Sequence, residues 1–333
     1  MSTLVTGGAG YIGAHVVRLL QAAGERVVVA DDLSTGDAAR IGDASLVVVD
    51  VADSRAVDVL AEAMASEQVL RVVHLAARKR VDESMARPAW YYQQNVGGTA
   101  NVIAAMALAG ADQLVFSSSA AVYGEPTAAD VAEDSPTVPV NPYGETKLAG
   151  EWLVRDAARA GVLRGVALRY FNVAGAGWDD LGDPEVLNLV TMVLQRLVRG
   201  QAPRVFGTDY LTPDGSCVRD FVHVHDVARA HAAALEHLDR PAAAGSAGFD
   251  VLNVGTGVGA SVLEVVAALG RITGLDATPI VAARRAGDAP SAVATVDRIR
   301  TVLGWRAEAG LEATLRSAWS AWQALPASTR ARG

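Results

Sequence analysis

Tyr143 and Lys147 are the first pair of residues in the chain whose types and spacing suggest chemistry. Four residues apart on a helix, their side chains lie on one face. A phenol with its ordinary pKa of about 10 is a poor base at neutral pH, but a neighbouring ammonium and a positively charged nicotinamide ring both favour the phenolate. Ser119, at the end of an upstream apolar run, can hydrogen-bond a substrate oxygen whose charge changes. These residues predict proton abstraction from an alcohol coupled to hydride transfer.

The same pair has a simpler interpretation when it is taken alone. Tyr143 would be a surface aromatic residue after Asn141 and Pro142, and Lys147 a solvated charge. The pair gains weight from a glycine cluster near the start of the chain, Gly7-Gly8-x-Gly10-x-x-Gly13, which follows an apolar run and opens an amphipathic one. In that context the glycines, with Tyr11 and Ile12 between them, predict a turn that admits a dinucleotide pyrophosphate to the amides of a helix N-terminus.

Two further positions refine the cofactor prediction. Asp31 closes the second apolar run, where a carboxylate accepts hydrogen bonds from the adenosine ribose and repels a 2′-phosphate, so the sequence favours NAD over NADP. The alternative is that Asp31 or Asp32 only caps a helix or a turn. Asp50 and Val51 follow the third apolar run, at a position where they could contact the adenine ring of the cofactor.

The elements that must hold these residues alternate strictly through the first half of the chain. Short β-branched runs at 4–5, 27–30, 46–49, 71–75, 113–117 and 165–170 are separated by segments with helical spacing at 14–23, 56–65, 98–109 and 143–160. This rhythm predicts the α/β class, with a Rossmann-type doubly wound parallel sheet. After Asn172 the rhythm changes, which predicts a smaller C-terminal substrate-binding domain.

The predicted division places residues 1–172, with returning segments at about 220–256, in an NAD-binding domain. Residues 173–219 and 257–325 form the second domain, and 326–333 are expected to be a flexible tail.

Composition narrows the function classes. The chain has 333 residues, 29 basic and 37 acidic, and its net charge of −8 disfavours binding to a nucleic acid backbone. The first residues lack the pattern of a signal peptide, and the longest apolar stretches are too short to cross a bilayer, so we expect no membrane contact and a cytoplasmic location. The single cysteine, Cys217, is expected to be a packing residue.

Several motifs together resemble the extended short-chain dehydrogenase/reductases, and within them most of all the UDP-glucose 4-epimerases. They are Thr6 to Gly13, Ser117 to Gly124, Pro142 to Lys147, Arg169 to Asn172, Asp214 to His223 and Arg284 to Asp288. The similarity runs from about Thr3 to Trp322. It implies a tightly held NAD, a UDP-hexose substrate that passes through a transient 4-keto intermediate, and a homodimer built on paired helices near 98–109 and 147–160.

The resemblance also implies roles for individual residues. Catalysis would fall to Ser119, Tyr143 and Lys147. The cofactor would contact Gly7, Gly10, Tyr11, Ile12, Gly13, Asp31, Asp50, Val51, Ala76, Lys79, Asn95, Tyr143, Lys147 and Tyr170. The UDP-sugar would contact Ser119, Asn172, Asn188, Arg219, Arg285, Asp288 and Ala292.

Two positions depart from the pattern of the family. Thr191 stands where a proline is usual, which makes the register of Asn188 less secure, and Ala292 is small where some relatives carry a tyrosine beside the sugar. The small side chain predicts that N-acetylated hexoses also fit. Arg78 and Arg80 add positive charge around Lys79 and have no role in this interpretation.

Other functions remain open at this point. A nucleotide-sugar dehydratase or dehydrogenase shares the fold, but dehydratases carry Asp-Glu where this chain has Ala120 and Ala121. A non-catalytic NAD-binding sensor would keep the glycine turn without the chemistry. Arg219 and Asp220 could form an ordinary surface ion pair. His223 and His225 would share one face of a strand, but no third ligand is visible and we predict no metal site.

Overall fold

A seven-stranded parallel sheet forms the centre of the protein. The computed structural model describes residues 1–126, 128–241, 248–285 and 287–325, so the expected tail lies outside the described residues. In spatial order the strands are β11 (Phe249–Val254), β7 (Arg164–Tyr170), β5 (Gln113–Ser119), β4 (Arg71–His74), β1 (Ser2–Thr6), β2 (Arg26–Asp31) and β3 (Ser45–Val48). Every neighbouring pair is parallel. The predicted α/β class with a Rossmann-type sheet is confirmed.

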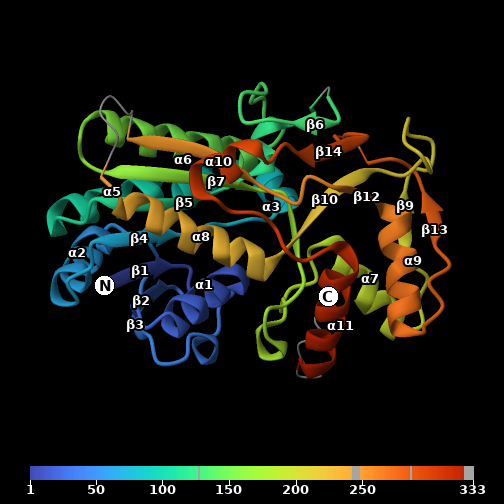
Figure 1. Ribbon diagram of the computed structural model, residues 1–333, viewed down its shortest axis with the longest axis horizontal. Helices are drawn as coiled ribbons and strands as arrows, with labels where there is room; N and C mark the ends of the chain where they lie inside the picture. The colour runs from blue at the N-terminus through green and yellow to red at the C-terminus, as the bar shows by residue number, and fades with distance from the viewer. Residues whose placement is uncertain (127, 242–247, 286, 326–333) are drawn as a thin grey trace.

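Helices cover both faces of this sheet (Figure 1). One face carries α1 (Tyr11–Ala22) and α8 (Val224–Asp239), and the other carries α2 (Ala56–Ser66), α5 (Gly98–Ala109) and α6 (Pro142–Arg159). Side chains alternate between the two faces along each strand: Val5 packs in the core beneath α1 and α8, while Leu4 packs beneath α2 and α5. Because both faces are covered, the central strands carry buried apolar side chains on both sides.

The edge of the sheet where its strands end is completed by short elements. After β4 come α3 (Val81–Ala86), α4 (Pro88–Tyr91) and a π-helical turn, Tyr92–Gly97, that leads into α5. A 3₁₀ turn, Ala38–Arg40, follows β2, and another, Ala120–Tyr123, follows β5. These connections lie where a doubly wound sheet binds its ligands, beyond the carboxyl ends of the strands.

The second part of the chain forms two small sheets and three helices. A mixed sheet contains β12 (Gly259–Ser261), β10 (Val218–His223), β14 (Ser291–Ala294) and β6 (Asp130–Val131), with β8 (Asn172–Ala174) beside β10. A second sheet pairs β9 (Arg204–Phe206) with β13 (Ile280–Ala282). The helices α7 (Leu189–Val198), α9 (Val262–Thr273) and α11 (Leu311–Ala324) share a separate apolar core with Phe221. A short 3₁₀ turn, Asp179–Leu181, joins the two parts.

The chain crosses between these parts more often than the predicted division assumes. The helix α10 (Asp297–Leu303) falls in the range assigned to the second domain. Its Ile299 is fully buried in the core beneath α1 and α8, together with Trp305 and Leu235. Residues 294–305 therefore pack with the large sheet, because α8 needs an apolar cover on the side away from the strands.

The two histidines expected on one strand lie on different elements. β10 ends at His223 and α8 begins at Val224, and His223 Nδ1 accepts a hydrogen bond from the amide of His225, 3.0 Å away. His223 therefore caps the helix, and the expectation that both side chains share a strand face is wrong. Among the described residues no group of His, Cys, Asp and Glu is arranged to hold a metal ion.

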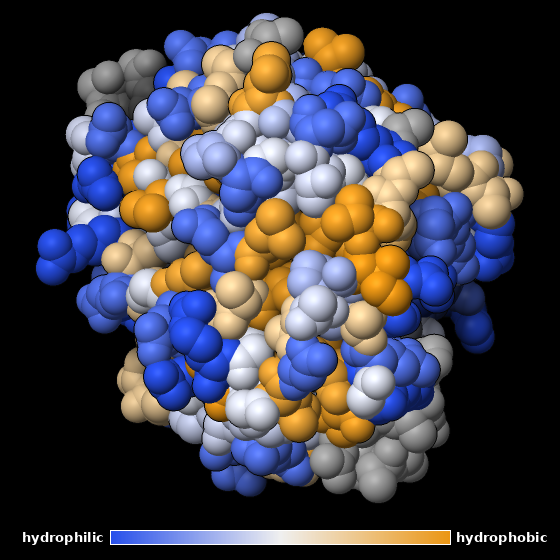
Figure 2. Space-filling model, turned by 90° about the vertical axis from the view of Figure 1, so that its right-hand side faces the viewer, coloured by the Kyte–Doolittle hydropathy of each residue, from blue (hydrophilic) through white to orange (hydrophobic). Residues whose placement is uncertain are grey.

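Some apolar side chains of the second part of the chain are exposed at the surface. Figure 2 views the end of the molecule that carries the second core and shows apolar residues grouped on that face. Leu275, Ile280 and Val281, in and before β13, are exposed there. Within the ranges that the structure describes, no helix has both the length and the apolar character needed to cross a membrane.

Candidate active site

A cleft lies at the carboxyl edge of the large sheet, above the turn from β1 to α1. All of the predicted cofactor residues line it except Asn95: Gly7, Gly10, Tyr11, Ile12, Gly13, Asp31, Asp50, Val51, Ala76, Lys79, Tyr143, Lys147 and Tyr170. The residues therefore converge from six connections of the sheet on one cavity, although they are widely separated in sequence.

The glycine turn has no room for larger side chains. A Cβ on Gly13 would lie 2.1 Å from the carbonyl oxygen of Gly7, and a Cβ on Gly7 would lie 2.7 Å from the amide nitrogen of Ala76. Gly7 also has a φ of +69°, which glycine adopts without strain. No side chain caps α1 at Gly10, so the amides of its first turn are free to bind an anion at the cleft. The turn therefore fits a dinucleotide pyrophosphate.

Asp31 lines this cleft and also holds the loop that follows it. Its Oδ2 accepts from the amide of Ala9 at 3.0 Å, and its Oδ1 accepts from the amide of Leu33 at 2.9 Å. Burial raises the pKa of Asp31, and the two amides oppose this rise. The capping role that was the alternative for Asp31 is thus present together with its position in the cleft.

Asn95 is buried beside the cleft rather than in its lining. Its Oδ1 accepts from the amide of Arg78 at 2.8 Å, and its Nδ2 donates to the carbonyl of Arg78 at 3.0 Å and to Thr146 Oγ1 at 2.9 Å. The side chain fixes the loop after β4 against α6. In this structure Asn95 positions other cleft residues, and its place in the shell around the cofactor stays a prediction.

The start of α6 sets Tyr143 and Lys147, the tyrosine and lysine predicted to be catalytic, one turn apart. Asn141 Oδ1 accepts from the amide of Gly144 at 2.9 Å, and Pro142 occupies the first helical turn. Tyr143 therefore lies in that turn, at the mouth of the cleft, and Lys147 follows it deeper in the protein. The Tyr143 hydroxyl hydrogen-bonds Ser119 at the end of β5, so the structure brings the predicted triad together.

The charges around Tyr143 differ from those expected. Burial raises the pKa of Tyr143, and the hydrogen bond from Ser119 and the charge of Lys79 oppose this rise. Lys147 points its ammonium at the carbonyl of Ser117, 2.8 Å away, and lies 6.0 Å from the Tyr143 ring centre. Burial lowers the pKa of Lys147 to about 8. Lys79 therefore supplies a positive charge near the phenol of Tyr143 that the sequence did not indicate.

Lys79 crosses the cleft toward the second part of the chain. Its Nζ lies 2.6 Å from Glu185 Oε2. Burial works against its charge, but Asp183 and Glu185 raise the pKa of Lys79. Glu185 and Pro184 also line the cleft, and sequence reasoning did not select them. No motif marks either residue, because both come from an irregular loop.

The predicted sugar residues lie outside the lining of this cleft. Arg219 donates to the carbonyl of Ala289 at 2.8 Å and reaches Asp288 at 3.5 Å. Ala292 stands opposite Arg219 in the β10 and β14 pair, so these three positions form one group. Asp220 is fully buried and accepts from the Thr256 amide at 2.8 Å, so it is not the partner in a surface ion pair with Arg219.

Of the other four predicted sugar residues, Ser119 is next to Tyr143 and the remaining three are more scattered. Arg285 is exposed and stacks 3.7 Å above the Phe206 ring centre, and Asn172 is exposed at the start of β8. Asn188 caps α7: its Oδ1 accepts from the Thr191 amide at 3.0 Å and its Nδ2 donates to Asp183 at 2.7 Å. A threonine at 191 supplies an amide that the usual proline lacks, and the cap uses it.

Comparisons with known proteins agree with this arrangement. The model of the NAD dependent epimerase/dehydratase family matches residues 3–255. The chain is 45% identical to UDP-glucose 4-epimerase from Azospirillum brasilense, covering 91% of this chain and 86% of that protein.

Two solved structures are similar over almost the whole chain. One is UDP-glucose 4-epimerase from Stenotrophomonas maltophila with bound NAD and formylated UDP-arabinopyranose: TM-score 0.90, 38% identity, covering 97% of this chain and 98% of that one. The other is the UDP-Glc/GlcNAc 4-epimerase from Campylobacter jejuni, with a TM-score of 0.84, 35% identity, and coverage of 97% and 99%.

Proposed function

The chain belongs to the NAD-dependent epimerase/dehydratase family, and on that premise we propose how its residues carry out the NAD-dependent 4-epimerisation of a UDP-hexose, the interconversion of UDP-glucose and UDP-galactose. The observation that carries the proposal is the convergence of Tyr143, Lys147 and Lys79 on one cleft whose glycine turn fits a dinucleotide.

In the proposed mechanism Tyr143 takes the proton from the 4-hydroxyl of the sugar. Ser119 hydrogen-bonds the same oxygen, which becomes a carbonyl oxygen, and Lys79 supplies positive charge that favours the phenolate. A bound nicotinamide supplies the reversible hydride acceptor for C4. Lys147 would hold the nicotinamide ribose. The keto sugar turns about its anchored diphosphate and is reduced on its other face, so the net redox change is zero.

In this proposal one part of the chain binds NAD and the other binds the UDP group of the substrate. The large sheet binds NAD through the cleft residues, with Asp31 at the adenosine ribose and Asp50 and Val51 at the adenine. The second part holds the UDP group through Asn172, Asn188, Arg219, Arg285 and Asp288. Guanidinium groups suit a diphosphate because they bind it through two parallel hydrogen bonds.

Incubating the purified protein with a panel of UDP-sugars and separating the products tests the reaction class. We expect NAD to copurify and UDP-glucose and UDP-galactose to interconvert with no net change in NADH absorbance. A dehydrogenase would consume added NAD stoichiometrically, and a dehydratase would release a deoxy keto sugar. Either product would contradict the proposal, as would NAD binding without turnover of any UDP-sugar.

We also propose that N-acetylated hexoses are substrates, because Ala292, which lies opposite Arg219 in the β10 and β14 pair, is small where some relatives carry a tyrosine. The relative from Campylobacter jejuni is itself named for both UDP-Glc and UDP-GlcNAc. An Ala292→Tyr variant should lower kcat/KM for UDP-N-acetylglucosamine by about tenfold or more, because a pocket filled by a side chain rejects the larger sugar. Turnover of UDP-glucose serves as the control and should change little; equal loss for both sugars, or none for either, would contradict the proposal.

A homodimer and a cytoplasmic location complete the proposal. On α5 and α6, the helices expected to pair, Leu108 and Trp152 are exposed, at 69% and 50%. Large apolar side chains on neighbouring helices favour burial against a second copy. Sedimentation equilibrium should give twice the chain mass of 34.5 kDa, and a mass of one chain would contradict the dimer.

A further inference from the structure

We propose that Arg78 and Asp32 form a latch across the dinucleotide cleft, which must open before the cofactor can leave. The inference rests on the proposed function, because an epimerase has to keep the same NAD through both hydride transfers. It gives a role to Arg78, which neither sequence motif nor family resemblance explains.

The path of the latch follows from the strand order. In the sheet, β1 lies between β4 and β2. Arg78 comes from the loop after β4, while Asp32 and Ser34 come from the loop after β2. A contact between these loops must therefore cross the carboxyl end of β1, where the glycine turn opens the cofactor cleft. All three residues line that cleft.

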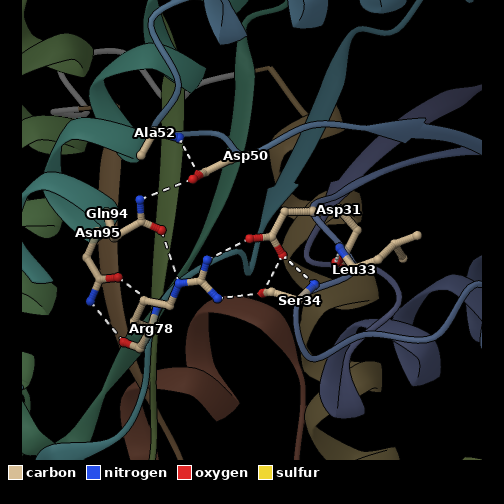
Figure 3. Close-up of polar contacts among 9 residues, drawn as sticks. Asp31, Leu33, Ser34, Asp50, Ala52, Arg78, Gln94 and Asn95 are labelled. Atoms are coloured by element: carbon tan, nitrogen blue, oxygen red, sulfur yellow. Dashed lines mark hydrogen bonds and ion pairs between the residues drawn. The ribbon is translucent and has the colours of Figure 1, made fainter. Parts of the chain in front are cut away.

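The guanidinium of Arg78 joins the two loops directly, as Figure 3 shows. Its Nη2 donates to Asp32 Oδ2 at 2.6 Å, and its Nη1 donates to Ser34 Oγ at 2.5 Å. Ser34 in turn donates from its amide and its hydroxyl to Asp32 Oδ1, at 3.0 and 2.6 Å. One nitrogen thus binds the carboxylate of Asp32 and the other the hydroxyl of Ser34, and these two acceptors are already joined to each other by the bonds from Ser34 to Asp32.

The opposite end of the latch is anchored to the π-helical turn. Asn95 holds the backbone of Arg78 through both its amide and its carbonyl. Gln94 Oε1 accepts from Arg78 Nε at 3.0 Å, and its Nε2 donates to Asp50 Oδ2 at 3.2 Å. The contacts therefore link the loop after β2 to the loop after β4 across the end of β1, and the π-helical turn links back to the loop after β3, which lies beyond β2. Together they surround the part of the cleft that the proposed function assigns to adenosine.

Partial burial strengthens the closing ion pair. The side chains of Arg78 and Asp32 are only 21% and 26% exposed, and the guanidinium lies 5.2 Å from the centre of the Trp90 ring. Burial opposes the charge of Asp32, but the hydrogen bonds from Ser34 and the charge of Arg78 hold the pKa of Asp32 below its usual value. The latch uses Asp32 and leaves Asp31 for the ribose, so closing it does not compete with cofactor recognition.

The exchange of bound NAD for isotopically labelled NAD, measured on the purified holoenzyme, tests the latch. Arg78→Ala and Asp32→Asn should each raise the exchange rate by about tenfold, because changes in a binding contact act mainly on dissociation. The double variant should be no faster than the faster single variant, since both substitutions remove one interaction. Arg55→Ala is the matched control: Arg55 lies outside the lining of the cleft, its guanidinium pairs with Asp53 at 3.2 Å, and exchange should stay at the wild-type rate.

Other results would overturn the latch. If the rate of NAD exchange is unchanged in both single variants, the two residues do not retain the cofactor. Faster exchange in Arg78→Ala together with slower exchange in Asp32→Asn would also contradict the latch. That result would mean that the Arg78 guanidinium, once freed from Asp32, binds the cofactor phosphates directly. Exchange is measured on bound nucleotide and needs no sugar turnover, so failure of the latch and failure of the proposed reaction are separate outcomes. The thermal unfolding of each apo variant checks that it is folded.

Discussion

Tyr143→Phe is expected to lower kcat for UDP-glucose epimerisation by about a thousandfold, as loss of the acid–base group of a proton transfer does. The substitution removes only the hydroxyl that hydrogen-bonds Ser119 and keeps the ring that lines the cleft. Binding of NAD should therefore be unchanged. Epimerisation rate and the molar ratio of NAD to protein are the two measurements.

A matched control is Tyr92→Phe. The Tyr92 hydroxyl donates to Glu145 at 2.8 Å on the exposed side of α6, and its removal should leave kcat within about twofold of wild type. If Tyr143→Phe keeps full activity, Tyr143 is not the base. If it loses NAD together with activity, the hydroxyl serves binding and the separation of roles is wrong.

The second large effect concerns stability: Glu151→Ala should reduce the free energy of unfolding by about 3–5 kcal/mol. Arg169 donates to Glu151 through Nε at 2.8 Å and Nη2 at 2.7 Å, and the two side chains are 6% and 4% exposed. Ser118 also donates to Glu151. Although burial opposes its charge, the hydrogen bonds to Glu151 raise the pKa of Arg169, so the alanine variant leaves an unpaired buried cation.

Urea unfolding of the apo protein measures this cost. Arg155→Ala, which breaks an exposed pair with Asp156 on the same helix, should cost less than about 1 kcal/mol. A double variant, Glu151→Leu with Arg169→Met, should recover part of the loss, because it removes both charges. A cost for Glu151→Ala no greater than that of Arg155→Ala would show that the buried pair does not hold α6 to β5 and β7.

The sequence predicts the large sheet well because its signals are local. The central strands are buried on both faces, so the apolar stretch 114–116 inside the run 113–117 stands out between amphipathic helices. The glycine turn and the spacing of Tyr143 and Lys147 are local as well, and strand ends of a parallel sheet converge on one edge. Cofactor residues far apart in sequence are therefore predictable as a group.

Features that depend on contacts between distant segments are not visible in this way. The pairing of Lys79 with Glu185 and of Arg78 with Asp32 joins loops from different connections, and nothing in either loop identifies its partner. The direction of the Lys147 ammonium toward the carbonyl of Ser117 depends on how α6 packs on β5. Ile299 looks like part of the C-terminal region because the chain returns to the first core only after leaving it.

Because the chain returns to the first core after forming most of the second part, the protein cannot be divided freely into fragments. β11 covers the edge of β7, and Trp305 closes the core beside α8 by donating to the carbonyl of Asp226 at 3.1 Å. A fragment that stopped at residue 172 would leave β7 as an open edge, which invites pairing with other chains. The nucleotide-binding half therefore cannot be excised at a single position, and during synthesis its core stays unfinished until the ribosome has passed Trp305.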